Sequence, residues 1–203
     1  MLKYEQELVA SGYITIAGID EAGRGPLAGP VVAAAVILPW DRPIPGVRDS
    51  KIVPPRERER LYYEIVGRAS AVGLGVVDVR DIDRINIFRA TVKAMEQAVH
   101  RLNIQPDAVL VDAMSLPGIK VPQRAIVHGD ATSYLIAAAS IVAKVSRDRF
   151  MTDYHARYPR YEFAVHKGYG TPRHLERLVR LGPCPIHRRT FRRVMTETAG
   201  DGW

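Results

Sequence analysis

Two adjacent carboxylates, Asp20 and Glu21, stand at the end of an apolar run of the sequence. Adjacent anions repel each other, and burying them costs stability unless a cation compensates the charge. Oxygen ligands without sulfur favour Mg²⁺ or Mn²⁺. The pair therefore predicts a divalent-metal site at the end of a strand.

Two more acids follow predicted strands. Asp112 closes a strand expected at residues 108–112, and Asp130 comes shortly after a strand expected at residues 124–127. Because open α/β sheets place their sites at strand ends, these side chains are expected to converge with the acidic pair. Four carboxylates describe a two-metal site for phosphoryl transfer, with ions roughly 3.5–4 Å apart. For Asp130, capping of the helix that follows remains the alternative.

A glycine-rich loop follows the acidic pair. Its pattern Gly23-x-Gly25-x-x-Ala28 imitates a dinucleotide-binding fingerprint. Such a fingerprint opens a helix, whereas the strand-like run 31–38 follows this loop, and the acids would repel a pyrophosphate. The glycines are better explained by close approach of the backbone to a ligand, whose sugar hydroxyl the loop could read. A plain tight turn is the alternative.

Apolar periodicity predicts the elements that position these residues. Strands are expected at residues 14–20, 31–38, 71–79, 108–112 and 124–127. Helices are expected at residues 2–9, 56–68, 81–102, 133–158 and 172–181, and the basic tail 183–203 has room for one more. This order predicts an α/β fold, with a mixed sheet, helices on both faces and a C-terminal helical extension.

Composition limits the classes of protein that need to be considered. The 203 residues are 47% hydrophobic and 25% charged, as in an ordinary globular domain, and no apolar run is long enough to span a membrane. A single cysteine, Cys184, excludes an internal disulfide, and the first residues do not resemble a signal peptide. A cytoplasmic protein without membrane contact is expected.

The net charge of +7 suits nucleic acid as partner, although a solvated basic face is the alternative.

Five motifs follow one another in order along almost the whole chain. The first, residues 18–32, reads Gly-Ile-Asp-Glu-Ala-Gly-Arg-Gly-Pro-Leu-Ala-Gly-Pro-Val-Val. The others are Asp-Ser-Lys at 49–51, the helical segment 138–149, His-Lys-Gly-Tyr-Gly-Thr at 166–171 and His-Arg-Arg-Thr-Phe at 187–191. Together they resemble the bacterial ribonuclease HII family.

This resemblance implies a ribonuclease H-like core with a mixed five-stranded sheet at residues 1–158. Residues 159–203 would form a small helical, basic extension that contacts substrate, integrated with the core into one domain. The family hydrolyses the RNA strand of RNA–DNA hybrids and incises on the 5′ side of single ribonucleotides in duplex DNA, leaving 3′-OH and 5′-phosphate ends. Its two-metal site implies that Mg²⁺ or Mn²⁺ is held by the four acids chosen above: Asp20, Glu21, Asp112 and Asp130.

The resemblance also implies contacts to the nucleic acid. Gly23, Arg24 and Gly25 would contact the ribose 2′-OH, the group that separates RNA from DNA. Tyr169 would pack against the next sugar. A basic cluster in the tail is expected either to face the duplex or to solubilise the tail: Arg188, Arg189, Arg192 and Arg193.

Other polar residues have two interpretations each. Lys51, Lys144 and Arg147 are candidate phosphate contacts, with a solvated face as the alternative for each. Asp148 is expected to orient basic residues rather than to bind metal. His166 either assists product release or proton transfer, or serves as a structural hydrogen-bonding residue.

Two positions depart from the family pattern. Ala113 follows the third acid where the family usually has glycine, and His128 stands where lysine is frequent. If they spoil the site, the chain would be a catalytically impaired module that binds hybrids. A nicotinamide-dependent oxidoreductase is the other rival, suggested only by the glycine loop. We expect an active enzyme that works as a monomer.

Overall fold

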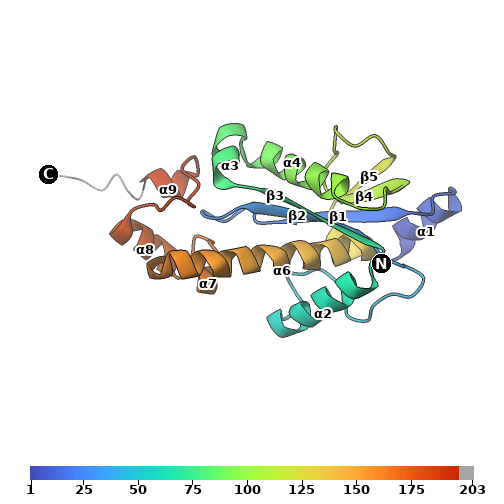
Figure 1. Ribbon diagram of the computed structural model, residues 1–203, viewed down its shortest axis with the longest axis horizontal. Helices are drawn as coiled ribbons and strands as arrows, with labels where there is room; N and C mark the ends of the chain where they lie inside the picture. Colours follow the sequence, from blue (N-terminus) through green and yellow to red (C-terminus); the bar gives the residue numbers. More distant parts are fainter. Residues whose placement is uncertain (197–203) are drawn as a thin grey trace.

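A mixed five-stranded sheet forms the centre of the computed structural model, which describes residues 1–196 (Figure 1). The strand order is β3-β2-β1-β4-β5. The strands are β1 (Ile16–Ala22), β2 (Val31–Ile37), β3 (Ala71–Val77), β4 (Ala108–Asp112) and β5 (Gln123–Ile126). β1, β2 and β3 pair antiparallel, whereas β4 and β5 run parallel to β1. The prediction of a mixed five-stranded sheet is confirmed.

Helices cover both faces of the sheet, as expected. In Figure 1, α4 lies on one face and the long α6 on the other, and α2 packs on the outer side of α6. β2 is buried along its whole length between these layers, which explains its continuous apolar sequence. The helices are α1 (Lys3–Ala10), α2 (Pro55–Arg68), α3 (Val79–Ile85), α4 (Ile87–His100), α5 (Gly129–Thr132), α6 (Tyr134–Arg157), the 3₁₀ helix η1 (Pro159–Tyr161), α7 (Phe163–His166), α8 (Pro172–Leu181) and α9 (Arg192–Thr196).

The start of α6 lies directly against β1. A Cβ atom at Gly18 would stand only 2.1 Å from the carbonyl carbon of Leu135, so only glycine permits this approach. Ser133 caps the helix, since its Oγ accepts a hydrogen bond from the amide of Ile136 at 3.3 Å. The close contact fixes α6 behind the strand that carries Asp20 and Glu21.

The single helix predicted over residues 81–102 was wrong. The chain forms α3 and α4 there, separated by Asn86 in the left-handed region with φ of 69°. The Asn86 side chain accepts a hydrogen bond from the amide of Arg89 at 3.0 Å and so caps α4. The apolar stripe continues across the break, so periodicity alone did not show it.

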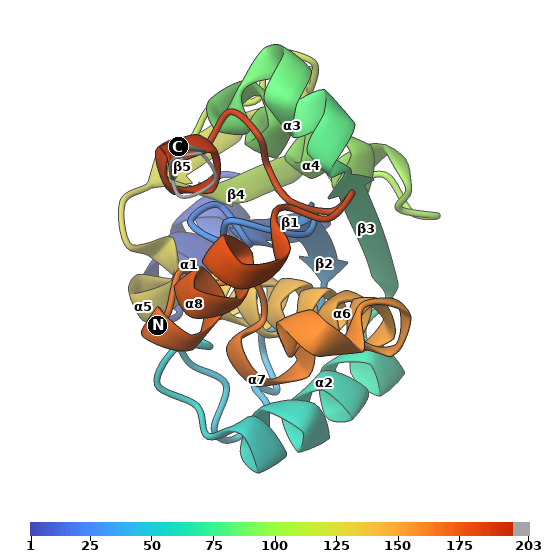
Figure 2. The ribbon, with the colours of Figure 1, turned by 90° about the vertical axis from the view of Figure 1, so that its left-hand side faces the viewer.

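The segment after α6 packs against the far end of that helix and against the glycine loop. Figure 2 shows α7, α8 and the end of α6 gathered together. Ala28 of the loop, Met151 of α6 and Phe163 of α7 share one apolar cluster with Ile186. Residues 197–203 of the predicted extension lie outside the described residues. No helix among residues 1–196 is both long and apolar enough to cross a membrane.

Candidate functional site

Three carboxylates converge where β1 and β4 end. One oxygen atom from each of Asp20, Glu21 and Asp112 lies within 4.8 Å of the others. The parallel register pairs Ile19 with Val111, so the following residues, Asp20 and Asp112, are neighbours on adjacent strands. Asp20 and Glu21 both belong to β1, which continues to Ala22, whereas the strand predicted from the sequence ended at Asp20. The antiparallel ladder to β2 therefore holds their backbone.

The fourth acid stands beside this trio on a short helix. Asp130 is buried within α5, and its Oδ2 atom lies 2.6 Å from Nζ of the exposed Lys51. The amide of Gly129 donates a hydrogen bond of 2.7 Å to Oδ1 of Asp112. This bond ties α5 to the end of β4. Lys51, expected to contact phosphate, therefore lies at the edge of the acidic cluster.

The cluster carries more negative charge than its surroundings balance. Burial, followed by the charges of Glu21 and Asp112, raises the pKa of Asp20 well above its ordinary value. Burial also raises the pKa of Glu21, against the opposing charge of Arg24. The pKa of Asp112 rises through burial, although the Gly129 amide partly counteracts it.

The donor set fits a divalent cation. Oε2 of Glu21 is buried and accepts no hydrogen bond within the described residues. A buried carboxylate oxygen without a hydrogen-bond partner destabilises the fold. A hard divalent cation is the partner that several clustered carboxylates prefer. Asp20, Glu21, Asp112 and Asp130 are the residues that would hold such ions.

The raised pKa of Asp20 predicts how stability depends on pH and metal. Folding raises the pKa of this carboxyl group above its ordinary value of 3.8. Protonation of Asp20 therefore stabilises the folded state fully below pH 3.8, and this stabilisation is lost as pH rises through the raised pKa. Without metal, Asp20→Asn is expected to melt above the wild type, by roughly 2–4 °C for each kcal/mol of relieved repulsion. The difference in Tm grows with rising pH. Mn²⁺ is expected to stabilise the wild type far more than the variant.

Thermal unfolding between about pH 5 and pH 8, in EDTA and in MnCl₂, measures both effects. A difference in Tm that shrinks as pH rises would contradict the assignment of Asp20 to a strained acidic cluster.

The two departures from the family pattern occupy left-handed backbone. Ala113 has φ of 53° and His128 has φ of 55°. Single residues adopt this conformation at a cost of about 1–2 kcal/mol when they are not glycine. Ala113 still donates its amide to the carbonyl of Ile126 at 2.9 Å, which closes β4 on β5. Asp112 reaches the cluster despite its alanine neighbour.

Two buried arginines hold the glycine loop from behind. Arg147 of α6 donates to the carbonyls of Pro30 at 3.0 Å, Ala28 at 3.1 Å and Lys167 at 3.1 Å. Its side chain is fully buried. The structure therefore contradicts a phosphate contact for Arg147, because its guanidinium is directed to backbone oxygens and away from solvent.

The second arginine, Arg188, completes the same support. It donates to the carbonyls of Gly29 at 3.0 Å, Arg24 at 2.9 Å and Gly23 at 2.6 Å. It is also fully buried, so it does not belong to an exposed basic patch in the tail; its neighbour Arg189 is exposed. Burial, then the charge of Arg147, lowers the pKa of Arg188 to about 9, which keeps it charged near neutral pH.

The two glycines predicted to contact substrate have different surroundings. Gly23 has φ of 102°, and a Cβ atom there would lie 2.0 Å from Nε of Arg147. A Cβ atom added at Gly25 would meet no neighbouring atom within 4 Å. Gly23→Ala is therefore expected to destabilise the fold by about 2 kcal/mol or more, whereas Gly25→Ala stays within about 1 kcal/mol of wild type.

Urea unfolding monitored by circular dichroism measures the free energies of unfolding. Equal losses in both variants would show that the loop is not held as described. If Gly25→Ala folds normally, any loss of cleavage that it causes reports on substrate approach rather than on folding.

His166 has both ring nitrogens engaged. Nδ1 accepts a hydrogen bond from the amide of Gly168 at 3.1 Å, so Nε2 donates to the carbonyl of Tyr161 at 2.6 Å. Burial lowers the pKa of His166, and the ring is neutral near pH 7. The structure favours the structural alternative for this histidine, which shapes the turn before Tyr169.

Tyr169 presents its ring toward solvent. Its side chain is 42% exposed, and Gly168 before it has φ of 84°. Nζ of Lys144 lies 5.8 Å from the ring centroid. Lys144 is half-buried and paired with Asp148 at 2.7 Å, which fits the expectation that Asp148 orients a basic residue.

A histidine pair next to this turn was missed by the sequence reasoning. Nε2 of His174 lies 3.0 Å from Nε2 of His187, and the His174 ring stacks on His166 with centroids 4.2 Å apart. Burial is the largest of the effects that lower the pKa of both His174 and His187 to about 4. Neutral rings pack here between α8 and the segment that carries Arg188. The only sequence signal for the pair was that His187 opens the His-Arg-Arg-Thr-Phe motif at 187–191.

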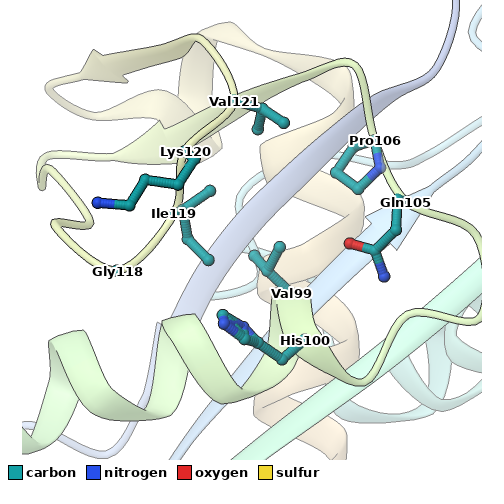
Figure 3. A pocket seen from close by; sticks show the side chains of 8 residues that line it. All are labelled: Val99, His100, Gln105, Pro106, Gly118, Ile119, Lys120 and Val121. Carbon is teal, nitrogen blue, oxygen red and sulfur yellow. The ribbon is translucent and has the colours of Figure 1, made fainter.

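A cavity of about 440 Å³ lies away from the acids, between the end of α4 and residues 118–121 (Figure 3). Pro106 and Lys120 belong to its described lining, which contains no carboxylate. Pro106 precedes β4, whereas Asp112 ends it, so the length of this strand, roughly 17 Å, separates the cavity from the metal site. The cavity takes no part in the chemistry derived from the acids.

Comparisons with known proteins match the chain over almost its whole length. A family model described as ribonuclease HII matches residues 17–194. A ribonuclease HII from Geotalea uraniireducens is 56% identical over 194 residues, which cover 96% of this chain and 90% of that protein. The crystal structure of ribonuclease H2 from Pyrococcus horikoshii OT3 has a TM-score of 0.76 at 28% identity, covering 91% of this chain and 97% of the other.

A third similarity supports the fold alone. The crystal structure of Bst-RNase HIII in complex with Mn²⁺ matches with a TM-score of 0.70 at 17% identity, covering 91% of this chain and 69% of that one. These neighbours share the ribonuclease H-like fold, which confirms the fold class predicted from the sequence.

Proposed function

Because the chain belongs to the ribonuclease HII family and is a metal-dependent nuclease with ribonuclease H activity on RNA–DNA hybrids, we propose that it also incises duplex DNA at single ribonucleotides. The cut falls on the 5′ side of the ribonucleotide and leaves 3′-OH and 5′-phosphate ends. The convergence of Asp20, Glu21 and Asp112 beside a rigidly held glycine loop is the observation that supports this proposal.

Asp20, Glu21, Asp112 and Asp130 hold two divalent ions in this proposal. When bound, such ions activate the attacking water and stabilise the leaving 3′-oxygen. The acids at the ends of β1 and β4 would hold the ions, and Lys51 keeps Asp130 oriented through its 2.6 Å contact. Mg²⁺ and Mn²⁺ both suit these oxygens.

The loop supplies the discrimination between ribose and deoxyribose. Arg188 binds the carbonyl oxygens of Gly23 and Arg24, while the amides of Arg24 and Gly25 make no hydrogen bond within residues 1–196. These amides are available for a sugar oxygen at a site where a Cβ-free Gly25 permits close approach. The Arg24 guanidinium, 3.4 Å from Glu21, stands at the edge of the metal site and suits a phosphate oxygen.

A DNA duplex with one ribonucleotide tests the proposal. We expect one cut on the 5′ side of that residue in Mg²⁺ or Mn²⁺, mapped by product length and by end-group analysis. The same duplex with 2′-deoxyribose at that position is the control and should stay intact. Equal cutting of both duplexes would refute recognition of the 2′-OH.

The alternative of an impaired hybrid-binding module predicts binding of a labelled hybrid without cleavage. The arrangement of Asp112 beside Asp20 in spite of Ala113 favours the enzyme. The oxidoreductase is disfavoured because the residues after the loop form β2, so no helix N-terminus faces a pyrophosphate there.

The proposed working state is a cytoplasmic monomer. One chain supplies all four acids and both arginines behind the loop, and its single cysteine, Cys184, is a buried free thiol, as suits a reducing compartment. Light scattering on the purified protein, alone and with duplex, tests the monomer.

A further inference from the structure

A polar hollow of about 220 Å³ lies between α2 and α6, the two helices packed together below the sheet in Figure 1. Arg58 and Glu59 of α2 line it on one side, and Asp148, Arg149 and Thr152 of α6 line it on the other. Lys167, from the turn after α7, closes it. None of these residues belongs to the acidic cluster, although Asp148 pairs with Lys144 and the carbonyl of Lys167 accepts a hydrogen bond from Arg147.

The hollow is lined by more cations than carboxylates, and one of its two carboxylates, Glu59, is already paired with Arg149. The carboxylate of Asp148 forms ion pairs with Nζ of Lys144 at 2.7 Å and with Nη1 of Arg58 at 3.8 Å. Lys167 donates to the hydroxyl of Thr152 at 3.0 Å, and no carboxylate of the described residues pairs with it. Burial lowers the pKa of Lys167; the charge of Asp148 opposes this shift, and the charges of Lys144 and Arg147 add to it. An anion at this point would relieve the repulsion.

The backbone of Lys167 gives an independent indication. Its φ is 51°, in the left-handed region, between a buried histidine and Gly168. Arg147 fixes this conformation by donating to the carbonyl of Lys167 at 3.1 Å. Lys167 is the C-cap residue of α7, a position where left-handed backbone is usual for glycine, so a lysine adopts it at a cost.

The position of the hollow relates it to the metal site. Nε of Arg58 donates to the carbonyl of Ser50 at 2.9 Å, directly before Lys51 of the acidic cluster. Lys144, which pairs with Asp148, also lies against the ring of Tyr169. The hollow is therefore linked by direct contacts to Lys51 beside the acids and to Tyr169. The cleaved strand is expected to pass both residues.

We propose that Lys167 in this hollow binds a backbone phosphate of the strand that contacts Tyr169, away from the scissile phosphate, whereas Arg58 is held by the carbonyls of Ser50 and Val53. Asp148 positions Lys144 and Arg58 and leaves Lys167 as the unpaired cation for the phosphate oxygen. The proposal rests on the proposed function in one respect, because it takes a nucleic-acid duplex as the ligand.

Binding of the single-ribonucleotide duplex to Lys167→Met, measured without divalent metal, tests it. We expect affinity to fall about tenfold near physiological salt and the slope of log K against log salt to decrease by about one. Lys120→Met makes the same charge change at the remote cavity of Figure 3 and should bind like wild type. Lys167→Gly removes the charge while relieving the backbone, so it should fold at least as well and lose the same affinity.

A series of duplexes, each with one neutral methylphosphonate, locates the contact. For wild type, one position in the ribonucleotide strand outside the scissile phosphate should weaken binding, and Lys167→Met should be insensitive to that position alone. Unchanged binding by Lys167→Met, or a sensitive position only in the complementary strand, overturns the proposal. Because the readout is binding, it remains valid if cleavage at the single ribonucleotide fails.

Discussion

Replacing Asp20 with asparagine is expected to lower the cleavage rate by about a thousandfold or more, which corresponds to about 4 kcal/mol of transition-state stabilisation. Asp20 is buried where β1 and β4 meet, within 4.8 Å of the carboxylate oxygens of Glu21 and Asp112. The amide keeps the shape of the side chain but removes one of the charges that hold divalent ions. Single-turnover cleavage of a ribonucleotide-containing duplex measures the effect.

Binding of the duplex in the absence of divalent metal should be retained by this variant, since the phosphate contacts do not involve Asp20. Asp153→Asn is the matched control, because Asp153 is an exposed acid on α6. It should cleave like wild type. Metal-dependent cleavage by Asp20→Asn at a comparable rate would overturn the assignment of the metal site.

Replacing Arg188 with methionine is expected to reduce the free energy of unfolding by about 3 kcal/mol or more. The buried guanidinium donates to the carbonyls of Gly23, Arg24 and Gly29, and the variant leaves these oxygens without that partner. Any variant protein that still folds should lose discrimination between ribose and deoxyribose. Without Arg188 the carbonyls of the glycine loop are no longer fixed, so the amides of Arg24 and Gly25 are no longer held in place for the sugar oxygen. Urea unfolding and the paired cleavage substrates measure the two effects.

Arg189→Met is the control for this prediction. Arg189 is the exposed neighbour, and its backbone amide, which donates to Asp83 at 3.0 Å, is retained in the variant. Its stability should match wild type within error. If Arg188→Met were equally stable, the glycine loop would not depend on the C-terminal segment.

The approximate positions of the strands, and the acids at their ends, were accessible from the sequence for a physical reason. Buried strands read as apolar runs, and acids at their ends are conspicuous because burial of a carboxylate is rare. The break between α3 and α4 was not accessible in this way. It depends on Asn86 in left-handed backbone, whereas the apolar residues on both sides continue one stripe.

The two arginines behind the glycine loop show the limit of sequence reasoning at the site. Arg147 and Arg188 were grouped with exposed cations because arginine is usually exposed. Their burial depends on contacts to carbonyls more than 100 residues away in the chain, which no local pattern reveals. The contact between His174 of α8 and His187 spans only 13 residues, but it lies outside the periodicity of any one helix or strand.

The distance along the chain between the loop and its supports has a consequence for folding. Arg188 and Gly23 are separated by 165 residues, and closing a loop of that length costs about 4–5 kcal/mol of chain entropy. During synthesis, the strands and the short helix that carry the four acids emerge before the segment that holds the glycine loop. Nascent chains are therefore expected to acquire metal ligands before they can recognise a ribonucleotide, and selective cutting begins only when the last helices have docked.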